Sequence, residues 1–131
     1  MTRFLIVAAG GGLGAMARYG LGLAFGRLTP GSTWPWATLS ANVLGGLVMG
    51  LLVGWLALRA GAGQESVRLF AAVGLLGGFT TFSAFSLEAV LMIERRQFAM
   101  AGGYVALSVV LSITALFIGL MVAGRAFGAA L

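Results

Sequence analysis

The sequence predicts an all-α integral membrane protein with four transmembrane helices. Of its 131 residues, 60% are hydrophobic and 8% are charged, whereas ordinary globular chains carry about 25% charged residues. The apolar residues form four long runs, each close to the length of about 20 residues that a helix needs to cross a bilayer. We therefore expect a single four-helix membrane domain over residues 1–131, with spans at about 4–26, 36–58, 69–93 and 98–122.

The composition also excludes several classes of function. The chain has no Cys and no His, which excludes thiol chemistry and His-ligated metals, and we expect no enzyme activity. The net charge of +5 is carried entirely by Arg. Because no basic cluster exceeds two residues, this charge indicates anchoring in a lipid bilayer and predicts no nucleic-acid partner.

The first run, residues 4–26, has two misleading features. Phe4–Ala17 imitates a secretory signal, and Gly10–Ala15 imitates the glycine turn of a nucleotide-binding fold. The nucleotide interpretation requires an acid about 20 residues downstream, but the first acid in the chain is Glu65. The signal interpretation would leave three spans behind and a glycine-rich apolar region. A membrane helix is therefore the better interpretation of this run.

Small residues at intervals of four predict close contacts between helices. In the first run these are Gly10, Gly14, Gly22 and Gly26. In the second run they are Gly46, Gly50 and Gly54.

The second run, residues 36–58, follows a loop and carries no charge. Pro35 favours a helix start, and tryptophans mark both ends as interfacial aromatics do. Thr38 and Asn42 lie one turn apart on one side of the expected helix. A lone Asn in a membrane most often forms a hydrogen bond between helices, and this structural role stays open beside a functional one.

The third run, residues 69–93, contains a glycine cluster that predicts a broken helix near the membrane centre. The cluster consists of Gly74, Gly77 and Gly78. Broken backbone at that depth must line a cavity or bind an ion, because lipid cannot satisfy its amides and carbonyls. Free carbonyl groups suit a small hard cation such as Na⁺.

Directly after the cluster, phenylalanines alternate with hydroxyl side chains. Phe82 and Phe85 are about one turn apart, and the hydroxyls belong to Thr80, Thr81, Ser83 and Ser86. Electropositive ring edges and uncharged donors attract an anion weakly, and weak binding is what conduction requires. The alternative is that the rings only pack and the hydroxyls bond to carbonyls one turn earlier.

The fourth run, residues 98–122, is uncharged but carries a polar stripe. Tyr104, Ser108 and Ser112 follow one another at intervals of four. Because each step drifts by only about 40° around a helix, the three side chains share one side.

The arginines are divided almost evenly between the two sides of the membrane. Four spans place both termini on one side, which carries Arg3, Arg59, Arg68 and Arg125. The other side carries Arg27, Arg95 and Arg96, with Arg18 inside the membrane nearer to it. Since positive charge sets orientation, we expect insertion both ways up and an antiparallel homodimer about a two-fold axis in the membrane plane. The alternative is that a single Arg fixes one orientation.

The motifs together resemble those of the Fluc (CrcB-type) fluoride channels over essentially the whole chain. They are Gly12-Leu13-Gly14-Ala15 with Arg18-Tyr19, then Thr38-Leu39 with Asn42 and Gly45, and finally Gly77-Gly78-Phe79-Thr80-Thr81-Phe82-Ser83 with Phe85, Ser86 and Glu88. The last motif is very specific, whereas the first alone would be weak.

The resemblance implies a dual-topology antiparallel homodimer with two parallel pores, each lined by both subunits. It implies that Phe82 and Phe85 form a pair of pore phenylalanines and that the Asn42 amide reaches into the pore. Further polar lining is implied for Thr38, Ser83, Tyr104, Ser108 and Ser112. Arg18 and Glu88 would lie nearer the vestibules.

The resemblance also implies a central structural Na⁺, held by the backbone carbonyls of Gly77 and Thr80. The expected transported species is the fluoride ion, exported passively through the prokaryotic plasma (inner) membrane after it enters cells as HF. The chain departs from the family at Ala84, where Thr is usual, and this missing hydroxyl bears on the conduction rate.

Two other classes of function compete with a channel. One is a small proton-coupled multidrug exporter of four-helix dual-topology type, but such transporters need a carboxylate in the first span, and this one has none. The other is a structural membrane protein, which predicts no ion flux.

Overall fold

The computed structural model describes residues 1–59, 61 and 63–128. Over these residues the chain is helical, in the order α1 (Thr2–Leu28), α2 (Trp36–Leu56), α3 (Gln64–Val67), η1 (Arg68–Leu76), α4 (Gly77–Phe79), α5 (Phe82–Glu94) and α6 (Phe98–Phe127). In the described part of the chain, four helical stretches are long and apolar enough to cross a membrane, the third being Gln64–Glu94. The chain is thus an all-helical, multi-pass membrane protein.

The helices run further than the apolar spans at most of their ends. α1 begins at Thr2 and α6 continues to Phe127, because a helix keeps its backbone hydrogen bonds in the interface beyond the hydrocarbon core. α2 is the exception and ends at Leu56, two residues before the end of the expected span at 58. Gly128 caps the end of α6, and its φ of 80° is left-handed and favours glycine.

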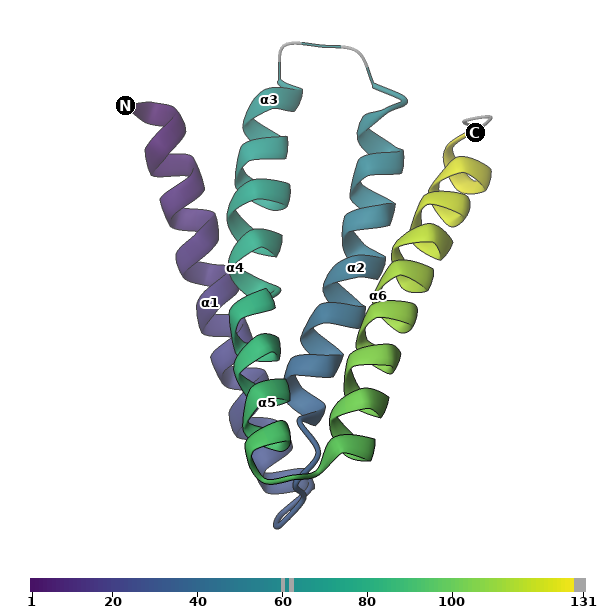
Figure 1. Ribbon diagram of the computed structural model, residues 1–131. Helices are drawn as coiled ribbons and strands as arrows, with labels where there is room; N and C mark the ends of the chain where they lie inside the picture. Colours follow the sequence, from purple (N-terminus) through teal and green to yellow (C-terminus); the bar gives the residue numbers. More distant parts are fainter. Residues whose placement is uncertain (60, 62, 129–131) are drawn as a thin grey trace.

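Two pairs of helices form the body of the molecule (Figure 1). α1 packs along η1 and α4, and α2 packs along α6. The pairs diverge toward the end that carries both termini and converge at the other end, where α5 also contacts α6.

Glycines bring the helices of each pair into backbone contact. A Cβ atom at Gly10 would fall on the Phe70 carbonyl oxygen, and one at Gly14 on the Leu75 carbonyl oxygen. In the second pair a Cβ at Gly50 would fall on the Leu116 carbonyl oxygen. A side chain at any of these positions would therefore separate the helices.

The expected glycine faces are only partly used. A Cβ at Gly46 would lie 2.8 Å from the Ser112 carbonyl oxygen, and a Cβ at Gly54 would clash with the Cβ of Ala123. Gly22 and Gly26, by contrast, have nothing within 4 Å among the described residues. The close packing of α1 is thus confined to its first half.

The third stretch leaves helical geometry after its glycine cluster, at Thr80 and Thr81. Thr80 has φ −79° and ψ 157°, and Thr81 has φ −153° and ψ 123°. The glycines themselves stay helical, with η1 wound as a wide π-helix up to Leu76. Gly74 and Gly78 serve contact with α1, since a Cβ on Gly78 would meet the Gly11 carbonyl oxygen.

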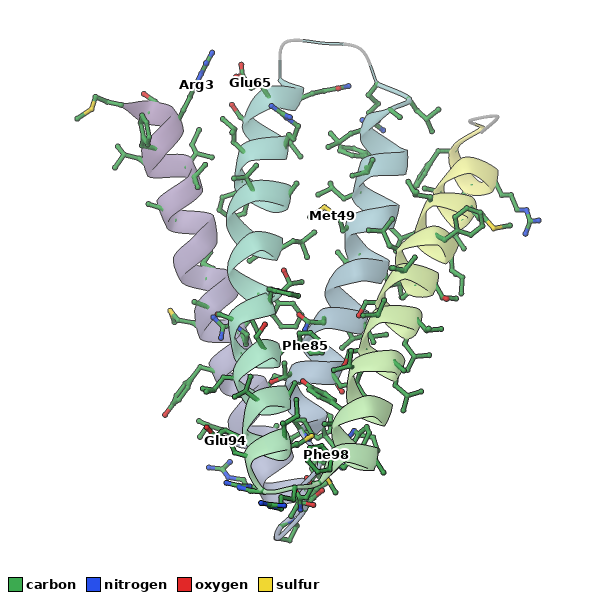
Figure 2. The ribbon with its side chains drawn as sticks, viewed as in Figure 1. Arg3, Met49, Glu65, Phe85, Glu94 and Phe98 are labelled. Atoms are coloured by element: carbon green, nitrogen blue, oxygen red, sulfur yellow. The ribbon has the colours of Figure 1, made fainter. Side chains whose placement is uncertain are left out.

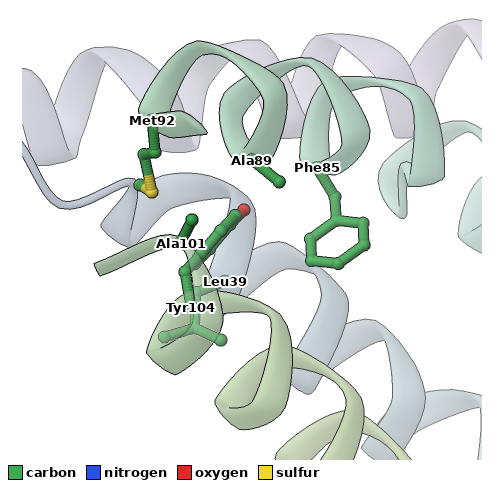
Figure 3. Packing of buried hydrophobic residues seen from close by; sticks show 6 residues of the cluster. All are labelled: Leu39, Phe85, Ala89, Met92, Ala101 and Tyr104. Carbon is green, nitrogen blue, oxygen red and sulfur yellow. The ribbon is translucent and has the colours of Figure 1, made fainter. Parts of the chain in front are cut away.

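The buried core lies at the convergent end of the molecule. It consists of Leu39, Phe85, Ala89, Met92, Ala101 and Tyr104, from α2, α5 and α6 (Figure 3). Tyr104 is the largest fully buried side chain of the described residues. Many large apolar side chains elsewhere are exposed, as expected of a surface that faces lipid or a second membrane chain.

Candidate functional site

An open groove lies between the interrupted third stretch, α2 and α6. Its volume is about 430 Å³. The residues proposed from the sequence that line it are Asn42, Thr80, Phe82, Phe85, Ser108 and Ser112. Its remaining wall is mostly apolar and includes Met49, Ile113 and Leu116; Met49 and Phe85 are labelled in Figure 2. No charged side chain lines the groove within the part of the chain that the structure describes.

The interruption is stabilised locally by the two threonines. The Thr80 N–H donates to the Leu76 carbonyl at 2.9 Å, which is the last helical bond before the break. The Thr80 hydroxyl donates to the same carbonyl at 2.9 Å. Thr81 is the N-cap of α5, because its hydroxyl oxygen accepts from the Ala84 N–H at 3.1 Å.

Asn42 holds the backbone of Thr81 from the neighbouring helix α2. Its Oδ1 accepts from the Thr81 N–H at 2.8 Å, and its Nδ2 donates to the Thr81 carbonyl at 3.0 Å. Because only an oxygen can accept the Thr81 N–H, the orientation of the amide is fixed. One N–H of Nδ2 is left over from this pair of bonds, in a side chain that lines the groove.

These bonds divert two donors away from carbonyls that would receive them in a regular helix. A helical carbonyl accepts from the N–H four residues later. The donor for Gly77 is the Thr81 N–H, which bonds to Asn42, and the donor for Thr80 is the Ala84 N–H, which bonds to the Thr81 hydroxyl. The Gly77 and Thr80 carbonyls therefore lose their helical partners, and such carbonyls are the oxygen donors that suit Na⁺.

The chemistry of these donors fits a small hard cation. Over residues 1–59, 61 and 63–128, no group of three His, Cys, Asp or Glu is placed to hold a metal ion, so a cation here would depend on neutral oxygens. Among the described residues, a Cβ at Gly77 would have only the Ala72 carbonyl oxygen within 4 Å, at 3.8 Å. Gly77 is thus not a packing glycine like Gly74 and Gly78.

The two phenylalanines differ in their surroundings although they contact each other. Their ring centroids are 5.6 Å apart with the planes at 43°. Phe85 is 9% exposed and also contacts the Tyr104 ring, with centroids 5.3 Å apart. Phe82 is 79% exposed at the open side of the groove. Phe85 is therefore fixed by the core, whereas Phe82 faces what lies outside the protomer.

Ser108 and Ser112 carry hydroxyl groups without a hydrogen-bond partner in the described residues. Both oxygens are buried, and both residues line the groove. Ser residues in membrane helices commonly donate to a carbonyl one turn earlier, as Ser86 does to Phe82 at 2.8 Å. The two groove serines do not, so their hydroxyls are left to a ligand or water.

Thr38 and Tyr104, expected from the resemblance to line the pore, both form hydrogen bonds to Glu88. The Thr38 hydroxyl donates to Oε1 of Glu88 at 2.7 Å, and the Tyr104 hydroxyl donates to Oε2 at 2.6 Å. Neither side chain is among those that line the groove of this protomer. No sequence pattern indicates this trio, which joins α2 to the consecutive helices α5 and α6.

The other two proposed residues, Arg18 and Ser83, are not among the described residues that line the groove. The half-buried Arg18 donates from Nε to the Gly78 carbonyl at 3.2 Å, directly beside the interruption. Ser83 is exposed, and its hydroxyl lies 3.3 Å from that of Thr81. Thr81 is one of the hydroxyl donors expected from the sequence, but its capping role is not predicted there, although a Thr directly before an apolar helical run is a helix-start signal.

Comparison with known proteins connects this geometry to a family. The family model described as CrcB-like protein, Camphor Resistance (CrcB), matches residues 5–120. The chain is 57% identical over 127 residues to the fluoride-specific ion channel FluC of Caulobacter sp. (strain K31), covering 97% of this chain and 98% of that protein. It is 57% identical over 128 residues to the FluC of Phenylobacterium zucineum (strain HLK1), covering 97% and 99%. The FluC of Hyphomonas neptunium (strain ATCC 15444) is 52% identical over 127 residues, covering 97% and 99%.

Proposed function

This chain belongs to the CrcB-type (FluC) family of fluoride ion channels, and from that premise we propose that it is a fluoride-selective channel for passive fluoride efflux. Its relatives carry the name of fluoride-specific channels, and the same activity is proposed for this chain at the groove between α2, α6 and the interrupted third stretch. The bacterial sources of those relatives support a place in the inner membrane.

The observation that carries the proposal is a groove with unpartnered donors and no charge. Moving a small anion out of water is costly unless donors replace its hydration. The hydroxyls of Ser108 and Ser112 and the spare N–H of Asn42 are such donors. Because none of them carries a full charge, they lower the barrier without trapping the ion.

The phenylalanines extend this path in the same chemical manner. The ring edges of Phe82 and Phe85 are electropositive, and both residues line the groove. Ser83 lies just outside the lining, so its proposed part in the path is at the margin. Thr38 and Tyr104 are proposed to contribute at the margin of the path by orienting the Glu88 carboxylate, to which both hydroxyls donate. Arg18 is proposed to favour anions near the entrance.

A second copy in the opposite orientation is proposed to complete the path. The groove is open on one side, and Phe82 projects from the protomer with 79% of its surface exposed. A two-fold axis in the membrane plane would place an equivalent groove on each copy. The antiparallel dimer would then contain two pores, each lined by both subunits.

A central Na⁺ is proposed at the Gly77 and Thr80 carbonyls, with the interruption near the membrane centre. Lipid offers these oxygens no donor, and the cation would supply the positive charge that compensates them. The Thr80 side chain is not needed as a ligand, because its hydroxyl already donates to Leu76. The loss of the helical donors of these two carbonyls supports a cation site that uses no charged ligand.

Fluoride release from proteoliposomes tests the proposal. Vesicles loaded with potassium fluoride, diluted into fluoride-free buffer and treated with valinomycin, should release fluoride to an electrode without any imposed proton gradient. Chloride-loaded vesicles are the matched control and should release their anion far more slowly. Release that requires an opposing proton gradient would favour the exporter. Release no faster than from fluoride-loaded liposomes without protein would favour a structural protein.

A further inference from the structure

We infer that Asn42 is a positioning residue that holds the third stretch open at Thr81 and thereby keeps the Gly77 carbonyl free for the central cation. The inference rests on the proposed function, because it assigns the cation site to that channel. It adds a role for Asn42 that is distinct from donating to an anion in the groove.

The two bonds of Asn42 form a clamp on one residue. Asn42 accepts from the Thr81 N–H at 2.8 Å and donates to the Thr81 carbonyl at 3.0 Å. This is the pattern by which an adjacent strand satisfies an extended residue, and Thr81 is extended, with φ −153° and ψ 123°. A side chain of α2 thus takes the place of a strand.

Without this clamp the Thr81 N–H would have one obvious acceptor. In a regular helix it would donate to the Gly77 carbonyl. An unsatisfied amide is very costly in a membrane, where no water replaces the lost partner. Removing Asn42 therefore favours closure of the helix onto the Gly77 oxygen, which is the same oxygen that the cation needs.

A second feature of α2 fits the same purpose. Gly45 lies three residues after Asn42, so both face one side of the helix. A Cβ on Gly45 would fall on Cγ2 of Thr80 and lie 3.5 Å from the Phe79 ring. The missing side chain makes room for Thr80, while Asn42 fixes Thr81. The surface of α2 therefore contacts both extended residues, Thr80 through its side chain and Thr81 through its backbone.

Thermal unfolding tests whether Asn42 affects Na⁺ binding. The unfolding midpoint of the purified wild type is measured at increasing Na⁺ concentration, with N-methyl-D-glucamine replacing Na⁺ to keep the ionic strength constant. A ligand of the folded state raises the midpoint in a concentration-dependent manner. In Asn42→Ala the half-saturating Na⁺ concentration should rise about tenfold, the equivalent of one net hydrogen bond of about 1.4 kcal/mol. Ser112→Ala is the matched control, since it removes another polar group of the groove but does not touch the interruption, and it should keep the wild-type value.

The outcomes separate this inference from the proposed function. An Asn42→Ala protein with wild-type Na⁺ dependence would overturn the inference, even if its fluoride flux fell. If the unfolding midpoint of the wild type did not depend on Na⁺, both the proposed role of Asn42 and the proposed sodium site would be overturned. Fluoride release from proteoliposomes would still test conduction independently. Lower fluoride flux in both variants, with a half-saturating Na⁺ concentration that is raised only in Asn42→Ala, is the expected result.

A second measurement needs no destabilising variant. Asn42 is the only asparagine in the chain, so ¹³C at the asparagine side-chain carbonyl labels a single site. In bilayers, solid-state NMR of protein that also carries ¹⁵N-threonine should show dipolar dephasing between this carbon and one threonine amide. Thr81→Ser keeps the backbone and a hydroxyl but removes the label, so the dephasing should vanish. Its absence from the wild type would overturn the clamp.

Discussion

The Tyr104 hydroxyl donates a 2.6 Å hydrogen bond to Glu88, and this bond ties α6 to α5 at the convergent end of the molecule. Thr38 donates to the other carboxylate oxygen from α2. The only acid inside the four expected spans therefore has both oxygens satisfied by side chains of two other helices. Such a carboxylate is part of the packing of the molecule as well as of the proposed entrance.

Replacing Tyr104 with Phe should destabilise the protein measurably. The substitution keeps the ring but leaves Oε2 of Glu88 without its donor, which costs about 1–3 kcal/mol. Thermal or denaturant unfolding of the purified protein measures the loss. Tyr19→Phe is the control, because Tyr19 is 70% exposed and no hydrogen bond from its hydroxyl is found among the described residues. Equal stability of the two variants would contradict the assigned bond.

Replacing Gly14 with Ala should prevent normal packing of α1. A methyl group there would fall on the Leu75 carbonyl oxygen of η1, and a backbone atom cannot rotate away. We expect loss of the assembled species in size-exclusion chromatography, or a marked fall in its unfolding temperature. Gly22→Ala makes the same chemical change where none of the described residues comes within 4 Å of the added Cβ, and it should be neutral or slightly stabilising through helix propensity. A tolerant Gly14 would refute the close contact.

Replacing Ser108 or Ser112 with Ala should separate function from stability. Each hydroxyl is buried without a partner in the described residues, and an unpaired buried hydroxyl costs free energy. Its removal should leave the unfolding temperature unchanged or slightly raised, yet fluoride flux should fall because a donor of the path is lost. Ser86→Ala, which removes a hydroxyl bonded within its own helix, is the control for flux. A loss of stability with normal flux would indicate a structural role instead.

Replacing Phe82 or Phe85 with Ile should lower fluoride flux while the protein still assembles. Ile keeps apolar bulk but removes the electropositive ring edge. The stability cost should stay under about 1.5 kcal/mol at the buried Phe85 and be smaller at Phe82, which is 79% exposed. Phe98→Ile, at an exposed position outside the groove lining, controls for loss of an aromatic residue. Wild-type flux in both groove variants would mean that hydroxyls and Asn42 suffice.

Reporter fusions at the C-terminus should be active on both sides of the membrane. The near balance of arginines leaves orientation weakly specified, and an antiparallel dimer needs copies of both orientations. Adding two Lys after Leu131 should shift the population toward one side. A wild type found in one orientation alone would contradict the antiparallel dimer.

The four helices could be predicted from apolar runs because length and hydropathy are properties of each segment alone. Periodicity also placed Tyr104, Ser108 and Ser112 on one side of α6. It could not show that this side divides between two environments. Tyr104 is fully buried against the Phe85 ring and bonds to Glu88, whereas Ser108 and Ser112 line the groove.

The position of the interruption could not be found from the glycines. Glycine signals both backbone freedom and close packing, and in Gly74 and Gly78 the structure uses the second property. The extended conformation falls instead on Thr80 and Thr81, and Thr81 is stabilised by Asn42 from a position 39 residues away. No local pattern encodes a partner at that distance.

The backbone contact of α1 with η1 and α4 has a consequence for how this chain can change over generations. At Gly10, Gly14 and Gly78 the atom in the way belongs to a main chain, so no substitution elsewhere can move it aside without shifting a whole helix. In ordinary cores, a smaller side chain at a neighbouring position can compensate for an oversized residue. At these three glycines no such compensation is available, because the neighbouring atom is part of the main chain. Variation in this part of the gene should accumulate at open positions of α1 such as Gly20 and Gly22.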